Sequence, residues 1–179
     1  DRTKSLKSTA RPQCEKKNII VLGDGIETEK YLSLCAVLAK VFDTKYRIVF
    51  RPHPVERERV LRLYGRKADN VAIEWEKEIC EAFEAAETVV SELSTGLFEA
   101  VGLANRIFLW DTPKANFCYP HHPFATFSDA NDLVAKIQDN ESGKMDPSTT
   151  EEFWAPNWKE NYLAFLENVC PGILNSGKD

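Results

Sequence analysis

The sequence lacks a hydrophobic run long enough to cross a membrane. Its longest apolar stretches, at 101–104 and 106–110, are far shorter than the roughly 20 residues that a membrane helix requires. A signal-peptide pattern is also missing, and the chain begins at Asp1 rather than at a methionine. We therefore expect no membrane-spanning helix, and we expect the chain to be a piece of a longer protein.

An excess of basic charge and paired cysteines are also missing. Lys and Arg number 23 against 28 Asp and Glu, which gives a net charge of −5. Such a balance argues against a nucleic-acid partner, so any phosphate must be bound locally. The 5 cysteines are odd in number and form no CxxC pair, which indicates free thiols, a reducing compartment and no zinc site. Cys35 and Cys80 fall on apolar helical positions, where a thiol packs as a small hydrophobe.

The composition is that of a globular protein, with 43% hydrophobic and 28% charged residues in a chain of 179. This length suits one well-cored domain. Residues 1–17 are polar and basic, and they are predicted to be a flexible leader or linker. The domain itself is expected over 18–170, with a tail at 171–179.

Short β-branched runs alternate with amphipathic helices along most of this domain. Strands are predicted at 19–22, 47–50, 71–75, 88–90 and 106–110, with helices at about 27–42, 56–65, 77–86, 94–103 and 129–138. The first helix should bury Leu34, Leu38, Val41 and Phe42. Continuous apolar strands joined by helices indicate a parallel sheet covered on both faces. The fold class is therefore a doubly wound α/β fold.

The C-terminal third of the chain is less regular. An aromatic and proline-containing stretch at 113–124 and a segment at 140–147 are expected to be loops. Residues 151–169 are rich in aromatic side chains, which predicts a helix or a bent pair of helices. Its aromatic packing face needs a partner surface.

Three loops should converge where the parallel strands end, at the edge where ligands bind in open α/β sheets. They contain Gly23 to Gly25, Arg51 to Pro54, and Ser91 to Gly96. The first loop lacks the third glycine of the dinucleotide motif and the Lys-Ser/Thr of a phosphate loop, so NAD and ATP chemistry is not supported. Its glycines serve either a tight turn or a close approach to ligand.

The third loop leads into a helix with an unusual start. Ser94 is a suitable N-cap, and capping alone could explain it. Gly96 costs about 1 kcal/mol against alanine in a helix, but it lets an anion reach the positive end of the helix. Thr95 and Glu99 lie four residues apart on one helix face. This arrangement predicts phosphate at the helix end and a ribose diol on the carboxylate.

His53 stands between two prolines, which hold it on a stiff loop just after Arg51. It is suited to donate to a phosphate oxygen, although a histidine that caps a turn is the ordinary alternative. His121 and His122 are expected at the mouth of the site. Three histidines without carboxylates or cysteines at ligand spacing do not indicate a metal.

Catalytic residues are not assigned. No nucleophile elbow, paired catalytic carboxylates or Ser-His-Asp arrangement is evident in the sequence. The many glutamates between Glu74 and Glu92 are expected to form a solvated helix face.

Two of these stretches carry a family resemblance: 49–54, with the sequence VFRPHP, and 90–100, with VSELSTGLFEA. Together they resemble the C-terminal, donor-binding domain of GT-B glycosyltransferases of the capsule and surface-polysaccharide type, over residues 18–170. The first is similar to the His-Pro motif of bacterial polysialyltransferases and teichoic-acid-type glycerophosphotransferases. The second is similar to the phosphate-binding loop of those families and of UDP-N-acetylglucosamine 2-epimerase relatives.

The resemblance implies a Rossmann-like fold and a role for each matching residue. His53 would contact the donor phosphate, Ser94 and Thr95 would bind phosphate, and Glu99 would hold the ribose. The remaining nucleotide-binding positions would be Gly23, Gly25, Arg51, Ser91 and Gly96. The donor would be a CMP-, CDP- or UDP-linked sugar, and no metal or other cofactor would be required.

In that family the acceptor site belongs to an N-terminal domain, and this sequence has none. The chain is thus expected to be a glycosyltransferase fragment that reaches its glycan acceptor through a missing domain. The resemblance places the protein in the cytoplasm, with the full-length enzyme associating peripherally with the inner face of the membrane. Two alternatives stay open: an epimerase or hydrolase of UDP-sugars on the same scaffold, and a non-catalytic Rossmann-like interaction module.

Overall fold

The computed structural model describes residues 17–154 and 157–169. The predicted leader and tail lie outside these residues, except for Lys17, which is the first residue of strand β1 (Lys17–Leu22). The predicted division of the chain into leader, domain and tail therefore remains a prediction.

The described residues form one seven-stranded sheet in the order β3-β4-β2-β1-β5-β6-β7. Its further strands are β2 (Tyr46–Arg51), β3 (Lys67–Ala68), β4 (Val71–Ile73), β5 (Ala86–Ser91), β6 (Arg106–Trp110) and β7 (Ala125–Phe127). All neighbouring pairs are parallel except β3 with β4. From β1 the chain runs outward through β2 to β4 and then returns past β1 to β5. The order reverses between β1 and β5, as in a doubly wound Rossmann-like sheet.

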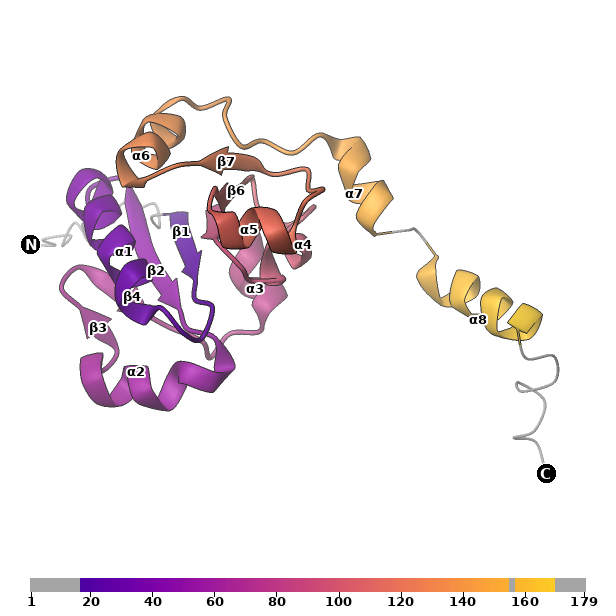
Figure 1. Cartoon of the computed structure of the whole chain (residues 1–179), viewed down its shortest axis with the longest axis horizontal. Helices are drawn as coiled ribbons and strands as arrows, with labels where there is room; N and C mark the ends of the chain where they lie inside the picture. The colour runs from indigo at the N-terminus through magenta and orange to yellow at the C-terminus, as the bar shows by residue number, and fades with distance from the viewer. Residues whose placement is uncertain (1–16, 155–156, 170–179) are drawn as a thin grey trace, which may run out of the picture.

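Helices cover both faces of this sheet (Figure 1). One face packs against α1 (Thr28–Phe42) and α6 (Ala130–Gln138), and the other against α3 (Ile79–Glu84), α4 (Gly96–Glu99) and α5 (Pro113–Cys118). The 3-10 turn η1 (Pro54–Glu56) and α2 (Arg57–Tyr64) follow β2. Ile19 and Val21 join the first core cluster, whereas Ile20 and Leu22 join the second. This alternation explains why β1 is apolar on both faces.

All five predicted strands are present, and the expected fold class is confirmed. The short elements β3, α5 and β7 were not predicted, because two to six residues are too few to show a period. The helix predicted to run to 103 ends at Glu99 instead. Gly102, with φ +82°, lies in the turns that follow.

Two side chains predicted to be buried are not. Val41 is 43% exposed, since the buried stripe of α1 runs through Leu34, Leu38 and Phe42 and leaves Val41 at its border. Cys80 is exposed because α3 is short and buries only Ala82 and Phe83. Cys35 is buried, as predicted.

The predicted C-terminal helix is a bent pair, α7 (Pro147–Phe153) and α8 (Trp158–Val169). The Phe153 ring packs on Phe98 of α4, with centroids 5.6 Å apart. In Figure 1, α8 extends away from the sheet and its covering helices, and Tyr162 and Phe165 are largely exposed. None of the described helices is long and apolar enough to cross a membrane.

Candidate functional site

The candidate site lies at the carboxyl ends of β1, β2 and β5, where the strand order reverses. Such a switch point opens a crevice above the sheet in doubly wound folds. The three loops predicted to converge do follow these three strands, and their side chains show how closely each pair of loops approaches.

The loops after β1 and β2 are in direct contact. Gly25 has φ +87°, and a Cβ atom there would lie 3.2 Å from Nδ1 of His53 and 2.9 Å from Cγ1 of Val55. A side chain at Gly23 would clash with the carboxylate of Glu56. The tight turn and a close approach to protein therefore account for both glycines.

His53 is exposed, and its ring has a defined orientation. Its Nδ1 accepts a hydrogen bond from the backbone N–H of Val55 at 3.3 Å, and His53 caps η1. An accepting Nδ1 places the proton of the neutral ring on Nε2. Nε2 has no hydrogen-bond partner within the described part of the chain. His53 thus presents an N–H donor on a stiff loop.

Glu56 was missed by the sequence reasoning, although it lies beside His53. It is only 2% exposed, and its Oε1 accepts the backbone N–H of His53 at 2.9 Å. Its Oε2 accepts the Thr28 hydroxyl. The side chains of His53 and Glu56 together form a capping box at the start of η1. The spacing of a cap residue and a glutamate three positions later is the signal that could have identified it.

Ser91 ties the loop after β5 to β1. Its buried hydroxyl donates to the backbone oxygen of Leu22 at 3.0 Å and accepts the N–H of Ser94 at 3.2 Å. Gly96 packs against the same strand, since a Cβ there would lie 2.9 Å from Cδ1 of Leu22. Both residues therefore hold the crevice in shape.

The start of α4 offers fewer free N–H groups than expected. The Ser94 hydroxyl accepts the N–H of Gly96 at 3.2 Å, and Leu97 and Phe98 donate to the oxygens of Ser94 and Thr95. Thr95 is exposed, and its N–H and hydroxyl have no partner among the residues that the structure describes. Because α4 has only four residues, its dipole is also small. Thr95 is therefore the available donor here.

Arg51 and Glu99 lie on the α3 and α4 side of the crevice. Arg51 is half-buried, and its guanidinium donates to the backbone oxygen of Lys77 at 2.8 Å. Burial, and then the charge of Arg57, lowers the pKa of Arg51, while Glu78, Glu76 and Glu99 oppose this shift. No hydrogen bond or ion pair joins Arg51 to Glu99 among the residues that the structure describes.

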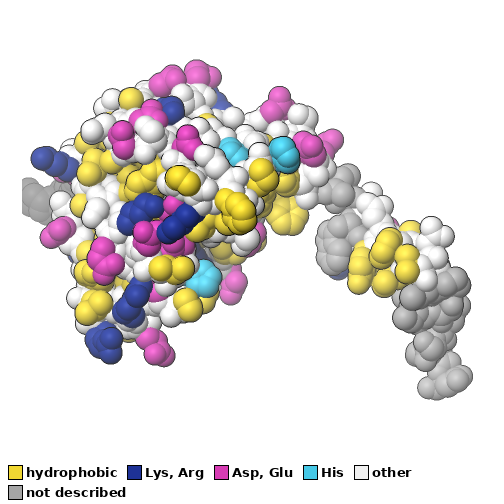
Figure 2. Space-filling model, in the orientation of Figure 1, with side chains coloured by type: hydrophobic (Ala, Val, Ile, Leu, Met, Phe, Trp, Pro, Cys, Tyr) yellow, Lys and Arg dark blue, Asp and Glu magenta, His cyan; other side chains and the backbone are white. Residues whose placement is uncertain are grey.

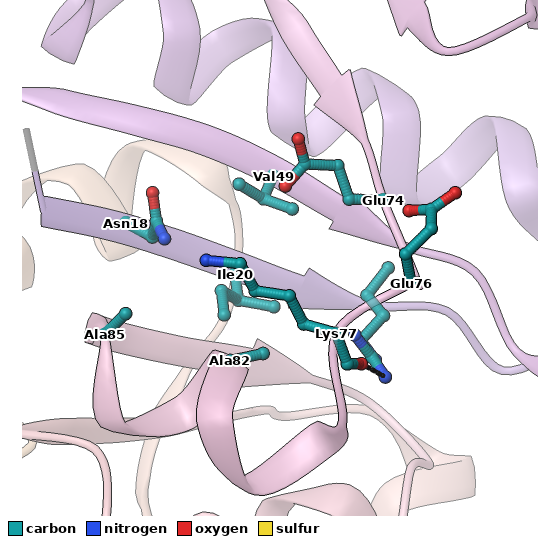
Figure 3. Close-up of a pocket in the computed structure, with 9 residues that line it drawn as sticks. Asn18, Ile20, Val49, Glu74, Glu76, Lys77, Ala82 and Ala85 are labelled. Carbon is teal, nitrogen blue, oxygen red and sulfur yellow. Dashed lines mark hydrogen bonds between the residues drawn. The ribbon is translucent and has the colours of Figure 1, made fainter.

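Arg51 also lines a cavity of about 220 Å³ between the sheet and α3. The lining includes Asn18 and Ile20 of β1, together with Val49, Glu74 and Lys77. Figure 3 shows Lys77 extending over Ile20 toward Asn18. His53 does not line this cavity and lies beside the loop after β1 instead, so Arg51 and His53 have different surroundings.

A network of ionic side chains lies on the α1 side of the crevice. Glu92 is 1% exposed, contacts Nζ of Lys30 at 2.5 Å and accepts the Thr112 hydroxyl at 2.6 Å. The prediction of a solvated helix face is therefore wrong for Glu92, which directly follows β5. Lys114 pairs with Glu27 in the same network, and charged side chains of both signs gather there in Figure 2.

The network also contains a carboxylate with an unused oxygen. Oδ1 of Asp24 accepts the backbone N–H groups of Ile26 and Glu27, whereas its buried Oδ2 has no hydrogen-bond partner among the described residues. Oxygens of Asp24, Glu27 and Glu92 lie within 4.8 Å of one another, which is close enough to hold a metal ion. Lys30 and Lys114 already balance part of this negative charge.

The histidine pair after α5 is separate from His53. Nδ1 of His122 accepts the N–H of Phe124 at 3.2 Å, and its ring stacks on Phe124. His121 is exposed. Within the described part of the chain, neither histidine forms a hydrogen bond or ring contact with the loops after β1, β2 or β5.

No family model matches the sequence, and no curated protein matches it. Several solved structures match by fold. The UDP-GlcNAc 2-epimerase of Methanocaldococcus jannaschii, solved with UDP-GlcNAc and UDP, has a TM-score of 0.51 at 9% identity and covers 84% of this chain. The glycosyltransferase SnogD from Streptomyces nogalater has a TM-score of 0.48 at 13% identity and covers 78% of this chain. The E. coli heptosyltransferase WaaC with ADP has a TM-score of 0.47 at 18% identity and covers 70% of this chain.

These similarities concern the fold. The match to the epimerase supports a Rossmann-like fold of the GT-B glycosyltransferase type, in agreement with the sheet order. The chain spans 46% of the epimerase, 39% of SnogD and 44% of WaaC, which is less than half of each.

Proposed function

We propose that the chain is the nucleotide-sugar-binding domain of a glycosyltransferase that acts in surface or capsular polysaccharide synthesis. The observation that carries the proposal is the orientation of His53. Its Nε2–H is unpaired within the described residues, and its loop packs against Gly25 at the point where the strand order reverses.

The residues suit the departure of a phosphate-bearing leaving group. Negative charge develops on the phosphate when the sugar is transferred, and donors fixed in advance stabilise this charge. His53 would donate through Nε2, and Thr95 through its hydroxyl and N–H. Glu99 would bind the ribose, and Arg51 would add positive charge to the site. Ser91, Ser94 and Gly96 would shape the loop that holds Thr95.

The donor would be a CMP-, CDP- or UDP-linked sugar, bound without a metal or other cofactor. The glycan acceptor would be supplied by a further domain, since the chain spans less than half of the solved structures it resembles. We place the full enzyme in the cytoplasm, peripherally bound at the inner face of the membrane where surface glycans are assembled.

Calorimetry against CMP, CDP, UMP and UDP tests the proposal. At least one nucleotide should bind, and its affinity should fall by about tenfold in His53→Ala, because a hydrogen bond to a charged phosphate is lost. Glu99→Ala should weaken binding to a similar degree. His121→Ala, which removes an exposed histidine elsewhere, should bind as the wild type does. No heat and no thermal shift with any of the four nucleotides would reject the proposal for this chain.

A second candidate is an epimerase or hydrolase of UDP-sugars, which the match to the UDP-GlcNAc 2-epimerase favours. The two candidates differ in their need for an acceptor. Incubation of the full-length protein with UDP-N-acetylhexosamine alone distinguishes them: turnover without any acceptor supports the second candidate, and turnover only with a glycan acceptor supports the first.

A further inference from the structure

Glu56 is a buried carboxylate whose contacts reach three separate segments of the site. Its Oε1 accepts the backbone N–H of His53 and lies against Gly23, and its Oε2 accepts the hydroxyl of Thr28 at the start of α1. We infer that Glu56 is a positioning residue, which fixes the ring of His53 for contact with phosphate. The inference rests on the proposed function, in which His53 binds the donor phosphate.

The burial of this carboxylate needs an explanation, because removing a charge from water is costly unless it is paired and hydrogen-bonded. Glu56 meets both conditions. Nη2 of Arg59 lies 3.3 Å from its Oε2 and also donates to the Thr28 hydroxyl at 2.5 Å. The Thr28 hydroxyl thus accepts from Arg59 while it donates to Glu56. The carboxylate is held by donors on both of its oxygens.

The position of the His53 ring depends on this arrangement. The Glu56 N–H donates to the His53 oxygen at 3.0 Å while its side chain accepts the His53 N–H, so the η1 turn is closed in both directions. This closed turn brings the N–H of Val55 to Nδ1 of His53. A Cβ atom at position 25 would lie 3.2 Å from Nδ1, so the glycine leaves room for the ring beside the loop after β1.

An amide at this position could not replace the carboxylate fully. The oxygen of a glutamine could still accept the His53 N–H. Its NH2 group would then face Arg59, which is itself a donor only, and the Thr28 hydroxyl would have to reverse its direction. We therefore expect the Val55 amide protection and the nucleotide affinity of Glu56→Gln to lie between those of the wild type and those of Glu56→Ala.

The test combines hydrogen exchange with nucleotide binding. The Val55 amide is bonded to the His53 ring and not to Glu56, so its protection reports the position of the ring. In Glu56→Ala, protection of the Val55 amide should be lost, and the affinity for the nucleotide that binds best among CMP, CDP, UMP and UDP should fall by about tenfold. Glu58→Ala, which removes an exposed carboxylate of α2, is the matched control and should change neither quantity.

The outcomes separate this inference from the proposed function. If the wild type binds no nucleotide, the proposed function fails, and Val55 protection alone decides the role of Glu56. Unchanged Val55 protection in Glu56→Ala would overturn the inference. If Glu56→Ala does not fold, Thr28→Val removes one donor to the carboxylate and should weaken binding about threefold. Wild-type affinity and wild-type Val55 protection in Thr28→Val would then overturn it.

Discussion

Gly25 and Gly65 both have positive φ angles, but their surroundings differ. A side chain at Gly25, where φ is +87°, would clash with Val55 and lie close to His53, whereas a side chain at Gly65, where φ is +66°, would enter open space among the described residues. The backbone strain of a non-glycine residue is therefore common to both positions, and the steric clash is confined to Gly25.

We expect Gly25→Ala to lower the free energy of unfolding by about 2 kcal/mol, and Gly65→Ala by about 1 kcal/mol. The larger loss at Gly25 comes from the contact with the Val55 side chain in addition to the backbone strain. Urea unfolding of the two variants measures the difference. Equal losses would show that the contact between the β1 and β2 loops is weaker than the structure indicates.

The roles of single residues could be predicted where local chemistry decides them. The two prolines around His53 and the glycines after β1 indicated a stiff loop and a tight turn from the sequence alone. Glu92 could not be recognised, because it is buried only through contacts with distant segments. Glu56 was overlooked although its spacing from His53 fits a capping box, and its burial involves the distant Thr28 hydroxyl. Burial of a charge depends on tertiary packing, which single-residue patterns do not contain.

At the scale of elements, α6 begins with a well-formed cap. Asp129 accepts the N–H groups of Asn131 and Asp132 at 2.8 and 3.1 Å. Asp132 in turn accepts the N–H of Ser128 at 2.9 Å and contacts Lys136. The hydrogen bond from Ser128, and then that from Lys136, lowers the pKa of Asp132 below 3.8.

This lowered pKa predicts a pH-dependent contribution to stability. A carboxyl whose pKa is depressed on folding stabilises the protein above its unfolded pKa, and the contribution is lost as the pH falls through the folded pKa. Asp132→Asn should therefore lower the Tm at pH 7, and its Tm should approach that of the wild type as the pH falls below 3.8. Thermal unfolding between pH 7 and pH 3 measures this, with Glu84→Gln on the exposed side of α3 as the control. A constant difference across this range would contradict the assignment.

The elements that the sequence predicted well are the long and strongly periodic ones, such as α1 and the apolar strands β1 and β6. Those it missed are short or begin at a proline. Pro113 starts α5 after a Thr112 cap, so a residue that suggested a loop instead marks a first helical turn. The end of α4 was predicted too late, because the residues after Glu99 form turns although their apolar spacing resembles that of a helix.

At the scale of the whole molecule, α8 leaves an apolar surface uncovered among the described residues. Tyr162, Leu163 and Phe165 are 55%, 46% and 59% exposed. The core clusters on both sheet faces are built from residues between 19 and 137, and α8 contributes to neither of them.

We therefore expect a chain that ends at Trp154 to keep the Tm of the full chain. It should also associate less with itself at high concentration, because exposed aromatic surface promotes such contacts. Differential scanning calorimetry and sedimentation velocity measure the two quantities. A Tm that falls by several degrees would show that the C-terminal helix stabilises the domain.

The architecture of the molecule followed from the sequence in its main lines. Alternation of apolar strands and helices predicted a parallel, doubly wound sheet, and the strand ends predicted where the loops would meet. The hairpin of β3 with β4 and the division of the site between the His53 side and the Arg51 side were not predictable. Both depend on tertiary packing, which a local sequence pattern does not contain.

The central position of β1 has a consequence for how the chain folds. Its two neighbours are β2, which comes soon after it, and β5, whose Ser91 bonds to Leu22 across 69 residues of sequence. Closing such a long loop costs chain entropy before the contact repays it. During synthesis, one edge of β1 therefore stays unpaired until β5 has emerged from the ribosome.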